Sequence, residues 1–207
     1  MSIALLVAIE PSLEIRRNIK KLRNWILEEM RKSISGLHEP HVTLFVNSFE
    51  NFSGVEKIVN DIAQNYKPFT VNTEGIEVFE NNPLAHGNPT FVYRVKDSRG
   101  IKMLQRTVVD RLNPLRTGDQ ANWCLKQNTH PSKKMLDNIA VYGYPFGPED
   151  WKFHATIWDV PQDMRDKFFQ EAKKYSRKSS WKVKGLGIYV HLGSDGFRLF
   201  KKYRLGG

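Results

Sequence analysis

Hydrophobic residues in the first half of the chain recur with two periods, one typical of strands and one of helices. Residues 3–9 form a continuous apolar run, which predicts a buried strand. Apolar residues then recur at helical spacing from Leu13 to about Lys32. The same patterns predict further elements in chain order, namely a strand at 41–46, a helix at 54–65 with Ser53 as its N-cap, antiparallel strands at 69–79 and 90–95, and a helix at 99–112. This β-α-β-α-β-β-α order is typical of an α+β fold.

The second half begins with a segment of weak periodicity and then becomes regular again. Residues 114–150 show few clear periods, apart from a candidate helix at 131–139 and a Gly/Pro-rich loop at 143–148. Long segments without regular structure are uncommon inside a domain unless they are functional, so we expect 114–150 to be a lid or substrate loop. The remaining elements are predicted as a strand at 153–159, a helix at 162–175, and strands at 181–190 and 196–204 joined by a turn at 193–196.

A four-residue phrase occurs twice, as His41-Val42-Thr43-Leu44 and as His154-Ala155-Thr156-Ile157. Each copy opens a run of β-branched and aromatic residues, so each is predicted to begin a strand. Successive side chains of a strand point to opposite faces, which places the histidine and threonine of each copy on the same side. The copies lie 113 residues apart (154 − 41), which favours two related halves about a pseudo-two-fold axis. If the two strands are neighbours, one pocket receives two imidazoles and two hydroxyls.

Composition and charge restrict the class of protein. A chain of 207 residues with 40% hydrophobic and 12% aromatic residues can bury a sizeable core as one domain. The single Cys124 excludes an intrachain disulfide and a cysteine-based metal site, and it favours a reducing, cytoplasmic compartment. We expect no membrane contact, because no apolar run approaches the length of a membrane span. The net charge of +10 favours an anionic partner such as nucleic acid, with a solvated basic surface as the alternative.

Two imidazoles and two hydroxyls are sufficient for phosphodiester hydrolysis without a metal. One histidine can accept a proton from the attacking water while the other donates a proton to the leaving oxygen. The threonine hydroxyls can donate hydrogen bonds to the non-bridging oxygens, where charge accumulates in the transition state. The alternative for either histidine is a strand residue hydrogen-bonded to a backbone carbonyl.

The other candidate residues have simpler interpretations. We expect His38, His86, His130 and His191 to lie on the surface. A zinc site built from His38, His41 and His154 is conceivable, but no His-x-x-x-His spacing supports it, so no metal is expected. Tyr142 or Tyr144 is expected to present a ring to the cleft, since aromatic rings in a basic protein can stack on bases.

Paired His-x-Thr-apolar strands at this spacing resemble the 2H phosphoesterase superfamily, which includes RNA 2′,5′-ligase-like proteins and cyclic phosphodiesterases. The resemblance implies a single bilobal α+β domain over 1–207, with two pseudo-symmetric antiparallel-sheet lobes and outer helices around a central cleft. It also implies a phosphodiesterase that uses no metal or cofactor and hydrolyses 2′,3′-cyclic or 2′,5′-linked ribonucleotides. In that family the residues matching His41 and His154 are catalytic, and those matching Thr43 and Thr156 bind the phosphate.

Three alternatives stay open within this resemblance. The chain could be a non-catalytic module that binds RNA or a nucleotide, or an RNA 2′,5′-ligase. It could also be a phosphonate-pathway cyclic phosphodiesterase, since residues 142–145 running into 153–156 are similar to that subgroup. We expect RNA or a small ribonucleotide as the substrate and a monomeric protein. The acid and base roles of the two histidines are not assigned.

Overall fold

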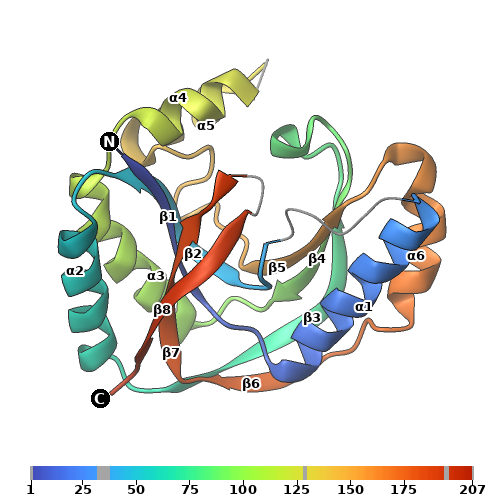
Figure 1. The fold of residues 1–207 in the computed structure, drawn as a ribbon, viewed down its shortest axis with the longest axis horizontal. Helices are drawn as coiled ribbons and strands as arrows, with labels where there is room; N and C mark the ends of the chain where they lie inside the picture. Colours follow the sequence, from blue (N-terminus) through green and yellow to red (C-terminus); the bar gives the residue numbers. More distant parts are fainter. Residues whose placement is uncertain (1, 32–37, 128–129, 194–195, 207) are drawn as a thin grey trace.

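A single antiparallel sheet of eight strands runs through the part of the chain that the computed structural model describes, residues 2–31, 38–127, 130–193 and 196–206 (Figure 1). In chain order the strands are β1 (Ile3–Ile9), β2 (Val42–Phe49), β3 (Phe69–Phe79), β4 (Thr90–Val95), β5 (His154–Asp159), β6 (Ser180–Val183), β7 (Gly185–His191) and β8 (Phe197–Arg204). Across the sheet their order is β6-β3-β4-β5-β2-β1-β7-β8. The two motif strands, β2 and β5, are therefore neighbours at its centre.

The seam between β2 and β5 divides the sheet into two halves of four strands. One half has the order β2-β1-β7-β8 and the other the order β5-β4-β3-β6, so each motif strand occupies the equivalent inner position. This arrangement confirms the expected α+β fold with antiparallel sheet on both sides of a centre. The prediction of one continuous strand over 181–190 is wrong. Lys184 separates β6, which pairs with β3, from β7, which pairs with β1 in the other half.

Helices cover the outer surface of the curled sheet. They are α1 (Leu13–Glu29), α2 (Phe52–Asn65), α3 (Arg99–Leu112), α4 (Asp119–Gln127), α5 (Lys133–Tyr142) and α6 (Arg165–Lys173), with short 3-10 turns η1 (Pro83–Ala85), η2 (Asn113–Leu115) and η3 (Gln162–Met164). In Figure 1, α1 and α6 lie on one side of the sheet, α2 and α3 on the other, and α4 and α5 at the top. No described helix has both the length and the apolar character that crossing a membrane requires.

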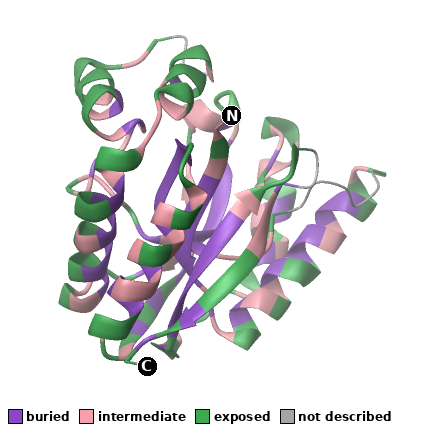
Figure 2. Cartoon of the chain, turned by 60° about the vertical axis from the view of Figure 1, so that its left-hand side comes forward, coloured by how far each residue is buried: buried purple, intermediate pink, exposed green. Residues whose placement is uncertain are grey.

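The core forms where the apolar stripes of these helices meet the strands. Ile19, Leu22 and Ile26 of α1 are fully buried, as the helical spacing in the sequence predicts. Figure 2 shows the same separation, with buried strands at the centre and exposed positions on the outer helices. The N-cap prediction for α2 is wrong by two residues, because Asn51, rather than Ser53, accepts the hydrogen bond from the Gly54 amide.

The segment predicted to be largely irregular, 114–150, contains two helices. The candidate helix at 131–139 corresponds to α5, whereas α4 was not expected from its short and weakly periodic sequence. The buried Asn47 of β2 connects this segment to the sheet, because its side-chain amide donates a hydrogen bond to the Tyr142 carbonyl at 2.8 Å. Gly143 follows with φ +70°, and a Cβ there would lie 2.9 Å from the Asn47 side chain, so this C-cap requires glycine. The turn predicted at 193–196 lies partly outside the described residues.

Candidate active site

The two motifs meet in a cleft of about 820 Å³ that all four motif side chains line. Val42 pairs with Ala155 across the seam, and both are buried in the core. Because the strands are antiparallel, one step from this pair places His41 opposite Thr156 and Thr43 opposite His154. The cleft therefore receives two imidazoles on a diagonal, and each lies across from the hydroxyl of the other strand. These are the four residues that the sequence indicates.

Both imidazoles are held by the same backbone hydrogen bond. Nδ1 of His41 lies 2.6 Å from the Glu39 carbonyl oxygen, and Nδ1 of His154 lies 2.6 Å from the Lys152 carbonyl oxygen. A carbonyl oxygen can only accept, so Nδ1 carries the hydrogen in each ring. In the neutral form of this tautomer, Nε2 has the free lone pair. Each histidine thus offers the same nitrogen to a ligand.

Burial lowers the pKa of both rings. Desolvation takes the pKa of His41 from 6.5 to about 3 and that of His154 to about 4. The carbonyl acceptors oppose these shifts, whereas nearby positive charge reinforces them, from Arg23 at His41 and from Arg94 at His154. Without a bound anion, both rings are therefore neutral at pH 7. An anion placed between them would favour protonation.

A buried arginine supports the β5 motif from behind. Arg23 of α1 donates from Nε to the Ile157 carbonyl at 2.8 Å and from a terminal nitrogen to the Thr156 carbonyl at 3.0 Å, and it also donates to the His38 carbonyl. Desolvation lowers the pKa of its guanidinium to about 10, which leaves it charged at pH 7. Arg23 also lines the cleft, so its charge is close to any anion bound there. Arg23 is not among the residues predicted from the motifs, although a charged residue on the apolar face of a helix indicates a buried role.

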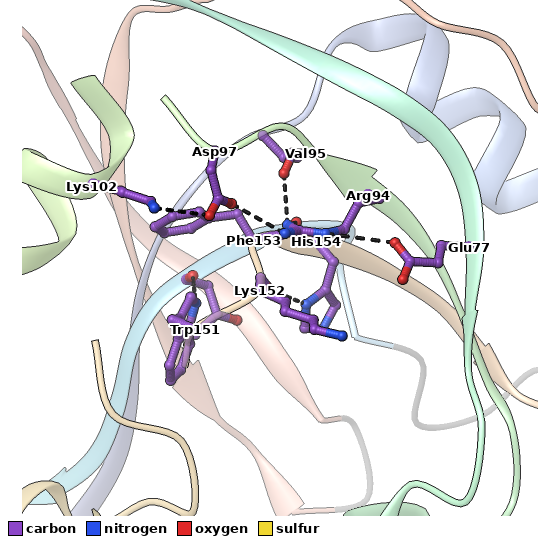
Figure 3. Close-up of polar contacts among 10 residues, drawn as sticks. Glu77, Arg94, Val95, Asp97, Lys102, Trp151, Lys152, Phe153 and His154 are labelled. Carbon is purple, nitrogen blue, oxygen red and sulfur yellow. Dashed lines mark hydrogen bonds and ion pairs between the residues drawn. The ribbon is translucent and has the colours of Figure 1, made fainter. Parts of the chain in front are cut away.

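Two further cations lie beside His154 (Figure 3). Arg94 is the register partner of His154 on β4, and it donates to the Phe153 carbonyl at 2.7 Å. Ion pairs to Asp97 and Glu77, at 3.1 and 3.6 Å, hold this guanidinium in place. Lys152 also lines the cleft and makes no ion pair with any described carboxylate. Its ammonium is consequently available to a ligand.

The two tyrosine candidates occupy different places. Tyr144 lines the cleft and packs against Trp151 with ring centroids 5.5 Å apart. Trp151 in turn donates from Nε1 to the Thr43 carbonyl at 3.0 Å, which fixes the β2 motif. Tyr142 does not line this cleft; it packs against the main core. Of the two tyrosines, Tyr144 is therefore the one that faces the cleft.

The remaining histidines divide into two groups. His86 and His130 are exposed, as expected. His38 and His191 are exposed but also line the cleft, and the His38 ring lies 6.4 Å from that of His41. His38 accepts a hydrogen bond from the Phe197 amide at 2.7 Å, and desolvation lowers its pKa to about 4. Among the described residues, no three His, Cys, Asp or Glu side chains gather in a group that could hold a metal ion.

Comparison with known proteins gives one family and a consistent fold. The family model described as the 2'-5' RNA ligase superfamily matches residues 10–195. The structure of TT0787 from Thermus thermophilus superimposes with a TM-score of 0.59 at 15% identity, covering 99% of this chain and 98% of that one. Escherichia coli LigT in its apo form gives a TM-score of 0.54 at 14% identity, covering 100% and 99% of the two chains. No curated protein sequence matches the chain. At these identities the solved structures show a shared fold.

Proposed function

Because the chain belongs to the 2'-5' RNA ligase superfamily, we propose that it is a metal-independent phosphodiesterase acting on a 2′,3′-cyclic or 2′,5′-linked ribonucleotide. The observation that carries the proposal is the matched pair of His41 and His154, each with Nδ1 held by a carbonyl in a common cleft. Solved structures of Escherichia coli LigT that contain NADP+ or 3'-AMP, with TM-scores of 0.52 and 0.51, support a nucleotide ligand for this fold.

The proposed reaction is an in-line displacement at phosphorus. Nε2 of one neutral histidine takes a proton from water, whose oxygen forms a bond to phosphorus. Nε2–H of the other, protonated histidine gives its proton to the leaving ribose oxygen as the P–O bond breaks. The two histidines finish with exchanged protonation states and reset through solvent. Because both rings have the same Nδ1 hydrogen bond, either histidine can serve as the acid or the base.

The proposed transition state gains its stabilisation from fixed donors and charges. Thr43 and Thr156 donate hydroxyl hydrogen bonds to the non-bridging oxygens, and the charges of Arg23 and Lys152 lie at the same cleft. Preorganised donors of this kind are worth about 10²–10³-fold in rate each when they point at the developing charge. The threonines are held on paired strands, so little reorganisation is needed when the charge forms.

The lowered pKa values make proton uptake part of substrate binding. The reaction needs one protonated ring, yet desolvation keeps both neutral at pH 7 when no anion is present. A phosphodiester anion between the rings raises their pKa, because opposite charge favours the protonated form. Binding and protonation are therefore coupled, and substrate affinity falls as pH rises through the pKa of the complex.

The decisive assay measures hydrolysis of 2′,3′-cyclic nucleotides and of a 2′,5′-linked oligoadenylate in the presence of EDTA. Turnover in EDTA that is lost in His41→Asn and in His154→Asn supports the proposal. Asparagine keeps a donor near the Nδ1 position while removing the titrating nitrogen. Activity that requires an added divalent cation would overturn it. Tight nucleotide binding without any turnover would instead identify a binding module.

A further inference from the structure

A β-bulge turns Asp159 into the cleft. Phe91 pairs with Trp158 but Val92 pairs with Thr156, so Ile157 is an extra residue on β5. Strict alternation would place Asp159 on the face opposite His154 and Thr156. The extra residue shifts the alternation of side chains by one position. Ile157 is fully buried, and Asp159 lines the cleft together with the motif side chains.

One oxygen of the Asp159 carboxylate accepts a hydrogen bond within the protein, and the other is free to accept one from a ligand. Thr90, its register partner, donates its hydroxyl to Oδ1, and Asn82 donates to the Thr90 hydroxyl at 2.7 Å. Among the described residues, no hydrogen-bond donor contacts Oδ2, and no Lys or Arg forms an ion pair with Asp159. Desolvation raises the pKa of this carboxyl, and the Thr90 hydroxyl and nearby His86 oppose that shift. All three members of the chain line the cleft.

The cleft does not share the strong positive charge of the molecule as a whole. The chain carries a net charge of +10, but the described residues that line the cleft include six carboxylates and only two Lys or Arg side chains. The carboxylates are Glu39, Glu77, Glu80, Asp119, Asp150 and Asp159, and the cations are Arg23 and Lys152. Ion pairs to Arg94, Arg165 and Lys134 neutralise Glu77, Glu80 and Asp150, so among the described residues Glu39, Asp119 and Asp159 keep no Lys or Arg partner. A polynucleotide lying along such a surface would bring further phosphates near these three unpaired carboxylates. A ligand with one phosphate at the histidines avoids this repulsion.

We propose that the substrate is a single nucleotide and that Asp159 selects a base with adjacent N–H donors, guanine above all; this inference rests on the proposed function. Strand geometry places Asp159 roughly 7–10 Å from Thr156, which is the scale of one nucleoside from phosphate to base edge. An ionised carboxylate only accepts, and the N1–H and N2–H groups of guanine match its two oxygens. Uracil presents carbonyls on both sides of its N–H and is repelled. The half-exposed indole of Trp123 lines the same cleft and can stack on the base.

The test measures affinity and turnover separately. Isothermal titration calorimetry compares guanosine, inosine and uridine 2′-monophosphates, and hydrolysis assays compare the 2′,3′-cyclic phosphates of guanosine and uridine. We expect guanosine to bind about tenfold or more tightly than uridine, with inosine, which lacks the exocyclic amine, in between. Asp159→Asn should remove most of this preference. Asp163→Asn, an exposed aspartate that does not line the cleft, is the matched control and should keep it.

Each outcome separates the inference from the proposed function. Equal affinities for the three nucleotides, or a preference that survives in Asp159→Asn, would overturn the role of Asp159. An RNA oligonucleotide ending in a 2′,3′-cyclic phosphate that binds much more tightly than the mononucleotide would overturn the single-nucleotide substrate. A guanosine preference without hydrolysis supports the base subsite and contradicts the proposed phosphodiesterase activity. Equal hydrolysis of both cyclic nucleotides supports the phosphodiesterase activity and contradicts the base subsite. If Asp159→Asn does not fold, the affinities of the three nucleotides for the wild-type protein test the base preference: the order guanosine, inosine, uridine supports it, and any other order contradicts it.

Discussion

The two motif strands, β2 and β5, carry the same chemistry in different surroundings. Each histidine donates from Nδ1 to the carbonyl two residues earlier in the chain. The side chains at those earlier positions have opposite charge, however: Glu39 precedes His41 and Lys152 precedes His154, and both line the cleft. Aromatic rings also flank the histidines unequally: His41 packs against Tyr189, Phe197 and His38, and His154 packs against Phe79.

The feature that the two strands share is the one that the proposed acid–base catalysis requires, and the feature that differs, the nearby charge, is the one that binding of an anionic substrate requires. The proposed reaction needs one imidazole that accepts a proton and one that donates it, and the shared backbone hydrogen bond leaves Nε2 as the free nitrogen in both rings. An anionic substrate needs charge, and that charge is concentrated on the β5 side. There Arg94 and Lys152 flank the motif, whereas β2 has the Glu39 carboxylate in the place equivalent to Lys152. Arg23 acts on both sides, because it hydrogen-bonds to the β5 backbone and its charge lowers the pKa of His41. We therefore expect catalytic rate to depend equally on both strands and affinity to depend mainly on β5.

The largest expected effect tests the equivalence of the histidines. His41→Asn and His154→Asn should each lower kcat by about 10²–10⁴-fold, since each removes one proton-transfer group. The double variant should be only slightly worse than either single variant, because the two rings act as a unit. Steady-state kinetics on a cyclic nucleotide measures this, with His130→Asn as the exposed control. Additive losses would contradict the paired mechanism.

The threonines provide the next test. Thr43→Val and Thr156→Val keep the shape of the side chain and remove the hydroxyl, so kcat should fall by about 10²–10³-fold in each while KM changes little. Thr70→Val, on an exposed position of β3, is the control and should leave both constants unchanged. A loss seen mainly in KM would mean that the hydroxyls bind the ground state and the transition state equally.

A smaller effect separates the two sides by charge. Lys152→Gln should raise KM several-fold with a modest change in kcat, because an ammonium close to an anion contributes mainly to affinity. Glu39→Gln should leave KM unchanged or lower it. Measuring both variants at two ionic strengths shows whether the effect is electrostatic, since salt should narrow the difference between them. Similar KM values for Lys152→Gln and Glu39→Gln would contradict the proposal that affinity depends mainly on the charge beside β5.

The smallest expected effect concerns stability and pH. The folded-state pKa values of His41 and His154, about 3 and about 4, lie below the ordinary value of 6.5. The unfolded chain therefore binds more protons between these limits, so the stabilisation is complete above pH 6.5 and is lost as pH falls toward 4. Tm should decrease monotonically across that window. The double variant His41→Asn/His154→Asn should show a shallower decrease, and an equal slope in both proteins would contradict the pKa assignment.

The sequence predicted the parts of the fold and site that depend on local periodicity. The paired motifs indicated His41, Thr43, His154 and Thr156, and the structure brings these four side chains to one cleft. Features set by three-dimensional packing could not be predicted in this way. The division of β6 from β7 at Lys184 depends on which half of the sheet each strand joins. The cleft-facing position of Asp159, likewise, depends on a bulge that only the pairing of β4 with β5 reveals.

Nitrogen-15 NMR of the two histidine rings tests the central claim most directly. We predict that both rings are neutral Nδ1–H tautomers at pH 7 in the free protein, with pKa values well below 6.5. On addition of a nucleoside 2′-monophosphate, both Nε2 signals should shift and at least one ring should take up a proton, since the phosphate raises its pKa. A ring that titrates near 6.5, or that does not respond to the phosphate, would contradict a paired histidine site.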